Sequence, residues 1–96
     1  MITISVTVSG GTTPLPIKLT IDNLDNQHDV KISKDGSFTQ DFDLPGGRYM
    51  IVVSGMNPLG GSTEISVSGT FTSGPMPDST STTNNQFYSV LFYGEI

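Results

Sequence analysis

The sequence predicts an all-β protein built as a sandwich of about seven short strands. Three observations lead to this prediction. The 96 residues include no alanine and 24 serines or threonines, a composition that disfavours helices and suits half-buried strands. Apolar and polar residues alternate with a period of two through much of the chain. Glycines and prolines separate the alternating segments at short intervals.

The first part of the chain contains three predicted strands, at residues 2–9, 17–22 and 30–32. In each of them Ile, Leu or Val alternates with Ser, Thr, Lys or Asp, so one face belongs to the core and the other faces solvent. Lys31 and Lys34 accompany the third strand. Charges at these places protect a sheet edge against unwanted pairing.

The middle of the chain predicts a turn, a strand, a second turn and the central strand. Asp35-Gly36 is expected to form a tight turn, because Gly accepts positive φ without steric cost. The strand 38–42 follows, and Leu44-Pro45-Gly46-Gly47 ends it. Residues 48–54 are the most continuously apolar run in this part of the chain. We therefore assign them to the central strand of the sandwich.

Two further strands flank one long polar segment in the last third of the chain. Residues 64–71 alternate again, and Gly69 within them is expected to mark a bulge. Residues 72–86 show no periodicity and are rich in Ser, Thr, Pro and Asn, which predicts a long loop. The last strand, 87–93, is apolar on both faces.

Seven short strands with Gly and Pro between them, and no helix, are typical of an immunoglobulin-like or prealbumin-like β-sandwich. A barrel is the main alternative. The chain length suits one domain, so we expect residues 1–96 to form a single sandwich with the loop 72–86. Because the chain has neither Trp nor Cys, the buried Trp and disulfide of an antibody domain have no counterpart here.

The charge balance narrows the classes of partner. Four basic and nine acidic residues give a net charge of −5. Nucleic-acid binding needs clustered Lys or Arg, which the chain lacks, and an anionic membrane surface is disfavoured for the same reason. The absence of cysteine excludes a disulfide framework and a cysteine zinc site. We expect protein partners, with no nucleic acid, no membrane and no cofactor.

The N-terminus gives an expectation about the compartment. Strand sequence begins directly after Met1, with no basic region and no cleavage site of a signal peptide. This pattern favours a complete chain made in a cytoplasm. The alternative is a domain excised from a larger secreted protein, with Met1 added for expression.

Two short runs resemble a known family. Asp35-Gly36-Ser37-Phe38 and Leu44-Pro45-Gly46-Gly47-Arg48-Tyr49 resemble the DGxF and LPPGxYxLxV patterns of carboxypeptidase-regulatory-like and related prealbumin-like sandwiches. The Pro-Leu-Pro before the second strand is similar to the start of that family's second strand. Gly46 stands where the family usually has a second Pro, and the segment after Gly55 departs from the pattern. The resemblance, over the first half of the chain, implies a non-catalytic module for stability, docking or surface display.

Residues for catalysis or metal binding are few. The only histidine, His28, lies in a polar turn and is expected to be an ordinary surface side chain, so we assign no catalytic residue. Oxygen ligands suited to calcium gather in one loop, at Asp22, Asp25, Asn26 and Asp29. Their spacing does not match an EF-hand loop, and Asx turns in a hairpin explain them as well.

Carbohydrate-binding sandwiches use exposed aromatic rings as stacking platforms. The candidates for such a role are Tyr49, Tyr88, Phe92 and Tyr93. The chain has no Trp and few aromatic residues overall. Core packing therefore accounts for most of these side chains.

The two-faced last strand gives the strongest functional indication. If strands 48–54 and 87–93 share a sheet, the outer face of that sheet is expected to present an apolar patch, formed by Met50, Val52, Tyr88, Val90 and Phe92. A monomer does not normally leave such a patch in water. Either the loop 72–86 covers it or another protein chain does, and we favour another chain.

These observations predict a small sandwich that binds or builds and does not catalyse. The leading hypothesis is a bacteriophage virion component, a capsid decoration or auxiliary head protein made in the host cytoplasm. The alternative is an accessory adhesion or carbohydrate-binding module of a bacterial cell-surface protein, which the segment Leu44–Tyr49 favours.

Overall fold

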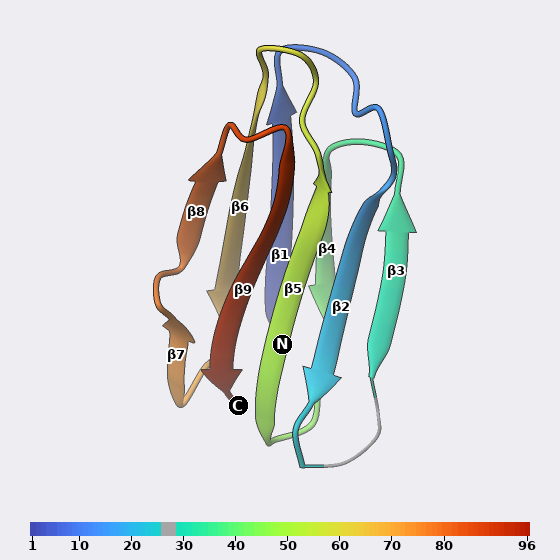
Figure 1. The fold of residues 1–96 in the computed structure, drawn as a ribbon. Helices are drawn as coiled ribbons and strands as arrows, with labels where there is room; N and C mark the ends of the chain where they lie inside the picture. The colour runs from blue at the N-terminus through green and yellow to red at the C-terminus, as the bar shows by residue number, and fades with distance from the viewer. Residues whose placement is uncertain (26–28) are drawn as a thin grey trace.

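The protein is a sandwich of two antiparallel sheets (Figure 1) in a computed structural model that describes residues 1–25 and 29–96. One sheet has the strand order β4-β1-β6-β8, with β1 at Ile2–Ser9, β4 at Phe38–Phe42, β6 at Ser62–Gly69 and β8 at Thr80–Thr83. The other has the order β3-β2-β5-β9-β7, with β2 at Ile17–Asn23, β3 at Val30–Lys34, β5 at Arg48–Met56, β7 at Ser73–Met76 and β9 at Phe87–Glu95. The all-β prediction is confirmed, and the arrangement is consistent with an immunoglobulin-like sandwich.

The core lies between the sheets and is built by the alternation seen in the sequence. The first strand places Ile2, Ile4 and Val6 inward, each at most 1% exposed. The other buried apolar side chains come from β2, β4, β5, β6 and β9: Ile17, Leu19, Ile21, Phe42, Tyr49, Ile51, Val53, Ile65, Val67, Tyr88 and Phe92. Because both sheets contribute one apolar face, their burial supplies the main driving force for folding.

The segment predicted to be a loop, 72–86, contains two four-residue strands. β7 hydrogen-bonds to β9 in the five-stranded sheet, and β8 hydrogen-bonds to β6 in the other. Both are edge strands in which half-buried residues alternate with exposed ones. The sequence shows no apolar periodicity here because neither strand buries an apolar row, and two strands were therefore missing from the prediction.

Two glycines near strand ends differ from expectation. Gly36 lies in the turn between β3 and β4, but its φ is not positive and nothing lies within 4 Å of the position of an added Cβ. Gly69 has a φ of +132° and ends β6 opposite Ile2, where an added Cβ would lie 2.5 Å from the Met1 carbonyl oxygen. The close approach of the two backbones, with no bulge in the pairing of β1 with β6, explains this glycine.

At both edges of the sandwich, the chain passes from one sheet to the other. The turn after β3 leads into β4 in the opposite sheet, and the residues after β7 lead into β8 in the opposite sheet. Figure 1 shows both crossings at the edges of the molecule. Among the described residues no helix is long and apolar enough to cross a membrane.

Candidate functional site

We call the outward surface of the five-stranded sheet the outer face, and it carries an apolar patch. Its residues are Met50, Val52 and Met56 from β5, Met76 from β7, and Phe87, Leu91 and Tyr93 from β9. The register pairs Met56 with Phe87, Val52 with Leu91, and Met50 with Tyr93, and the pair of Ser54 with Ser89 lies between the first two of these rows. Phe87 is 64% exposed, Leu91 44% and Met76 43%.

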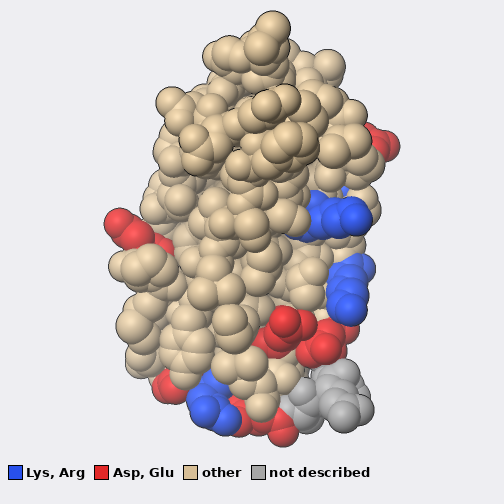
Figure 2. Space-filling view, in the orientation of Figure 1, with Lys and Arg blue, Asp and Glu red and all other residues tan. Residues whose placement is uncertain are grey.

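Figure 2 views the molecule from the side of this sheet. Among the described residues, the centre of the view shows no charged side chains, which lie along the left and right edges and at the lower end. Neither β7 nor β8 covers the outer face, because β7 lies in the plane of the sheet beside β9 and β8 belongs to the opposite sheet. The predicted alternative, that the segment 72–86 folds over the patch, is therefore wrong.

Two of the five residues predicted for the patch lie on the outer face, and three do not. Met50 and Val52 face outward, and both are half-buried. Tyr88 and Phe92, at 7% and 1% exposure, point into the core, and Val90 packs against it. The register places Phe92 opposite the buried Ile51, which fixes this row inward.

A signal for the correct face of β9 is present in the sequence. The outward row contains Ser89 between Phe87 and Leu91, whereas the row of Tyr88, Val90 and Phe92 has no hydroxyl except at the end of the tyrosine ring. The row with fewer hydroxyl groups lies inside, although the Tyr88 hydroxyl in that row is buried without a hydrogen-bond partner among the described residues. Phe87, Leu91 and Tyr93 are the residues that the sequence analysis placed on the wrong side.

The lower end of the outer face is polar and internally paired. The Tyr93 hydroxyl donates a hydrogen bond of 2.8 Å to Glu95 Oε1, and this contact raises the pKa of Tyr93. The Arg48 side chain donates to Asp25 Oδ1 from Nη2 at 2.8 Å and from Nε at 3.0 Å. These contacts hold the pKa of the Asp25 carboxyl below its ordinary value of 3.8 and raise that of Arg48.

The three calcium candidates that the structure describes, Asp22, Asp25 and Asp29, are not gathered into a site. Asp25 is paired with Arg48, and Asp29 accepts a hydrogen bond of 3.1 Å from the Asn23 backbone. Asp22 lies on the outward side of β2, opposite Met50. Among the described residues no three His, Cys, Asp or Glu side chains come together as metal ligands. The predicted residues Asn26 and His28 lie outside the described part of the chain.

Three of the four aromatic candidates for carbohydrate stacking belong to the core. They are Tyr49, Tyr88 and Phe92. The Tyr49 hydroxyl accepts a hydrogen bond from Asn23 Nδ2 at 3.1 Å and donates one of 2.6 Å to the Pro45 carbonyl, while burial raises its pKa. Tyr93 is half-buried, and Phe87, which the sequence analysis did not consider for this role, is the most exposed ring.

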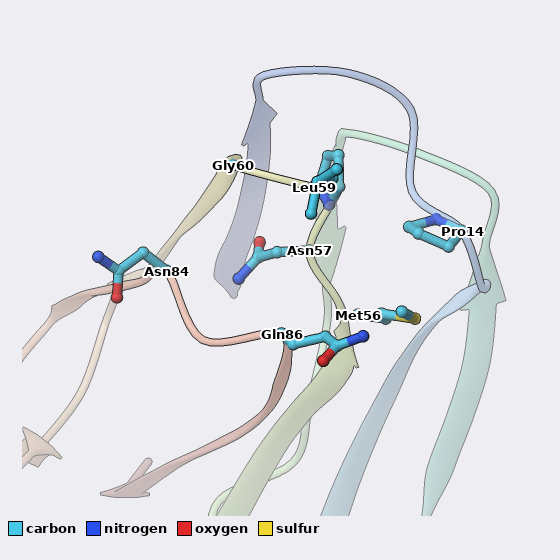
Figure 3. A pocket seen from close by; sticks show the side chains of 8 residues that line it. Pro14, Met56, Asn57, Leu59, Gly60, Asn84 and Gln86 are labelled. Carbon is cyan, nitrogen blue, oxygen red and sulfur yellow. The ribbon is translucent and has the colours of Figure 1, made fainter.

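A second candidate site is a pocket at the end of the sandwich where β5 and β9 meet their loops (Figure 3). It has a volume of about 300 Å³ and is lined by Pro14, Met56, Asn57, Pro58, Leu59, Gly60, Asn84 and Gln86. Asn57 is buried at its base and donates hydrogen bonds to the carbonyls of Thr83 and Asn85. In Figure 3 Asn57 and Gln86 lie between Asn84 on one side and Met56 and Pro14 on the other.

The loops around this pocket contain no charged residue. They are 10–16, 57–61 and 84–86. Leu59 at the tip of one of them is 103% exposed. The pocket therefore suits a small neutral ligand and offers amide groups for hydrogen bonds. It contains no nucleophile paired with a base.

The comparisons with known proteins add no family to this description. No family model matches the chain, and neither a curated protein nor a solved structure matches it.

Proposed function

We propose that the protein is a non-catalytic structural subunit that packs its outer face against another protein chain in a larger assembly. The observation that carries this proposal is the exposure of three apolar side chains, Phe87, Leu91 and Met76, on a face whose centre shows no charged side chain. Soluble monomers rarely expose contiguous apolar patches of this kind.

The outer face has a clear thermodynamic reason to bind. Fully burying a Leu, Phe or Met side chain contributes about 1.5 to 3 kcal/mol relative to leaving it in water. In the isolated chain, roughly half of this free energy is not gained, because three apolar side chains are 43% to 64% exposed: Phe87, Leu91 and Met76. A partner that covers all three gains about 1 kcal/mol from each of them.

Within this class we propose a virion component, such as a capsid decoration or auxiliary head protein of a bacteriophage. A subunit of that kind has two requirements. It must be a compact module that keeps its shape without disulfides, and it must contact the particle through a broad surface. The cysteine-free sandwich, with the chain crossing between the sheets on both sides, meets the first need. The five-stranded outer face meets the second.

The test uses a phage or prophage genome that carries the gene. We expect peptides of this chain in purified particles by mass spectrometry. The variant Leu91→Arg should be lost from the particles, because an arginine at the centre of a buried contact has no partner. Ser68→Arg places the same charge on the exposed outward side of the opposite sheet and should be retained. If both variants are retained in the particles, the outer face is not the surface that binds them.

The loop-end pocket supports a second candidate, an adhesion or carbohydrate-binding module. Its volume lies at the small end of ligand pockets, about the size that one sugar ring needs. Exposed Asn84 and Gln86 supply amide groups, which bind sugar hydroxyls. A glycan screen followed by calorimetry would test this function, with Gln86→Ala weakening binding about tenfold. A glycan that binds the wild type and Gln86→Ala equally well would exclude the pocket as the binding site.

A further inference from the structure

The projected area of the outer face is smaller than the area that a standard interface buries on one partner, and the relief of the side chains reduces this difference. Strands 4.8 Å apart that rise about 3.3 Å per residue give the five strands a projected area of about 550 Å². The relief of the side chains raises the accessible area above this projection. A standard protein interface buries about 800 Å² on each partner. A second copy of the sheet, turned end for end, would cover β2, β5 and β9, whereas β7, which pairs only with the last residues of β9, would lie beside the contact.

Two opposite charges lie on this face at equal distances from its middle row. The middle row consists of Thr20, Val52 and Leu91, which the register places side by side on β2, β5 and β9. Lys18 lies two residues before Thr20 on β2, and Asp22 lies two residues after it. Alternation along the strand turns all three side chains outward. Lys18 is exposed and Asp22 half-buried.

This arrangement is complementary to itself. A two-fold axis along the middle row lays one copy over another with β2 above β2, so that Lys18 of each copy faces Asp22 of the other. The same axis lays Leu91 over Leu91 and Val52 over Val52. Stacked sheets lie about 10 Å apart, a gap that a lysine and an aspartate can bridge together. A two-fold axis along the strands would instead place β2 over other strands and pair neither charge.

We propose that the outer face binds a second copy of this chain about a two-fold axis across the strands, held by the Leu91 row and by two Lys18–Asp22 ion pairs. The inference rests on the proposed function, because it names the first partner of the same face. Lys31 lies at the edge of the middle row, opposite Thr20. The axis therefore faces Lys31 of one copy with Lys31 of the other, at the edge strand β3, where both exposed side chains reach solvent.

The first test is the mass of the chain in solution by light scattering over a wide range of concentration. We expect twice the chain mass of 10.2 kDa at high micromolar concentration. Leu91→Arg should weaken the association at least about 100-fold, because it places two unpaired charges at the centre of the interface. Ser68→Arg should leave it unchanged. Circular dichroism of both variants shows that a loss of mass is not a loss of fold.

The second test exchanges the charges. Lys18→Asp and Asp22→Lys each turn two attractive pairs into two repulsive ones, so each should weaken the dimer about tenfold. The double variant restores opposite charges at both places and should recover the wild-type association. Neither side chain belongs to the core, so folding does not interfere with this result. A double variant weaker than both single variants would overturn the proposed axis.

The outcomes separate this inference from the proposed function. A wild-type chain that stays monomeric up to about 1 mM overturns the pairing of two copies. If the monomeric wild type binds particles and the variant Leu91→Arg does not, the assembly function stands, and only the second copy as the partner is wrong. If particle binding is also indifferent to Leu91→Arg, both proposals fail.

Discussion

At the scale of single residues, aromatic side chains on the same strand have opposite environments. Phe92 is 1% exposed and packs among the core residues, whereas Phe87 is 64% exposed on the outer face. Both are phenylalanines on β9, so their composition and intrinsic propensity are the same. Any difference in their effect on stability comes from burial alone.

Replacing each of these two phenylalanines by alanine tests which row of β9 faces the core. Phe92→Ala should lower the free energy of unfolding by about 3 to 5 kcal/mol, because it removes buried apolar area and leaves a cavity. Phe87→Ala should change it by less than about 1 kcal/mol. Urea unfolding of the two variants checks the prediction. Costs of similar size would mean that the register of β9 against β5 is wrong.

The ion pair between Asp25 and Arg48 makes the stability of the fold depend on pH, and the direction of this dependence follows from the pKa of Asp25. Arg48 lowers the pKa of Asp25 in the folded state from 3.8. The stability from this contact is therefore present above the unfolded-state pKa, and it is lost as the pH falls through the folded-state pKa. Between about pH 4 and pH 2 the wild type should lose more stability than Asp25→Asn. Denaturant unfolding at several pH values tests this, and parallel profiles would contradict it.

At the scale of elements, the pairing of β1 with β6 depends on the absence of a side chain at Gly69. A Cβ there would lie 2.5 Å from the Met1 carbonyl oxygen and 2.7 Å from Ile2 Cα, at a φ of +132°. Gly36 is a control in a turn, with nothing within 4 Å. Both substitutions add the same methyl group, so they differ only in the space and the backbone conformation at each position.

Gly69→Ala should therefore destabilise the protein by at least about 2 kcal/mol, since the strands must move apart or the backbone must change. Gly36→Ala should be neutral within about 0.5 kcal/mol. Thermal or urea unfolding of the two variants provides the measurement. A small cost at Gly69 would show that β6 can end elsewhere.

The elements also show what the sequence can predict. β1 and β4 have the predicted bounds, because each alternates cleanly between one buried and one exposed face. β7 and β8 were missed because edge strands without a buried row have no such pattern. The apolar patch was predicted on the correct strands, β5 and β9, but β9 is apolar on both faces. The pairing of Phe92 with the buried Ile51 shows which row of β9 points inward, and in the sequence only the position of Ser89 distinguishes the two rows.

At the scale of the whole molecule, the order of strands in the sheets differs from their order in the chain. β1 lies between β4 and β6, and its residue Ile2 pairs with Phe42 and Gly69. No two strands of that sheet follow each other directly in sequence. Closing such long loops before their contacts form is entropically costly, which slows folding.

We therefore expect refolding in milliseconds to seconds, the range of sandwiches dominated by distant pairing. Stopped-flow dilution from denaturant, followed by tyrosine fluorescence, measures this rate. The six prolines add a slower phase that a prolyl isomerase should accelerate. Complete refolding within microseconds would be incompatible with the strand order.

Both chain ends lie in the lower half of Figure 1, while the uncharged loops 10–16 and 57–61 lie at the opposite end. The backbone of Ile96 exchanges two hydrogen bonds with Gly47 at the lower end. A fusion partner, a biotin or a surface anchor attached through either terminus would therefore hold the molecule upright, with its loops pointing away from the support. New peptide sequences grafted in place of Leu59 would be displayed at the free tip. The sandwich is thus a ready scaffold for display, whatever its natural partner is.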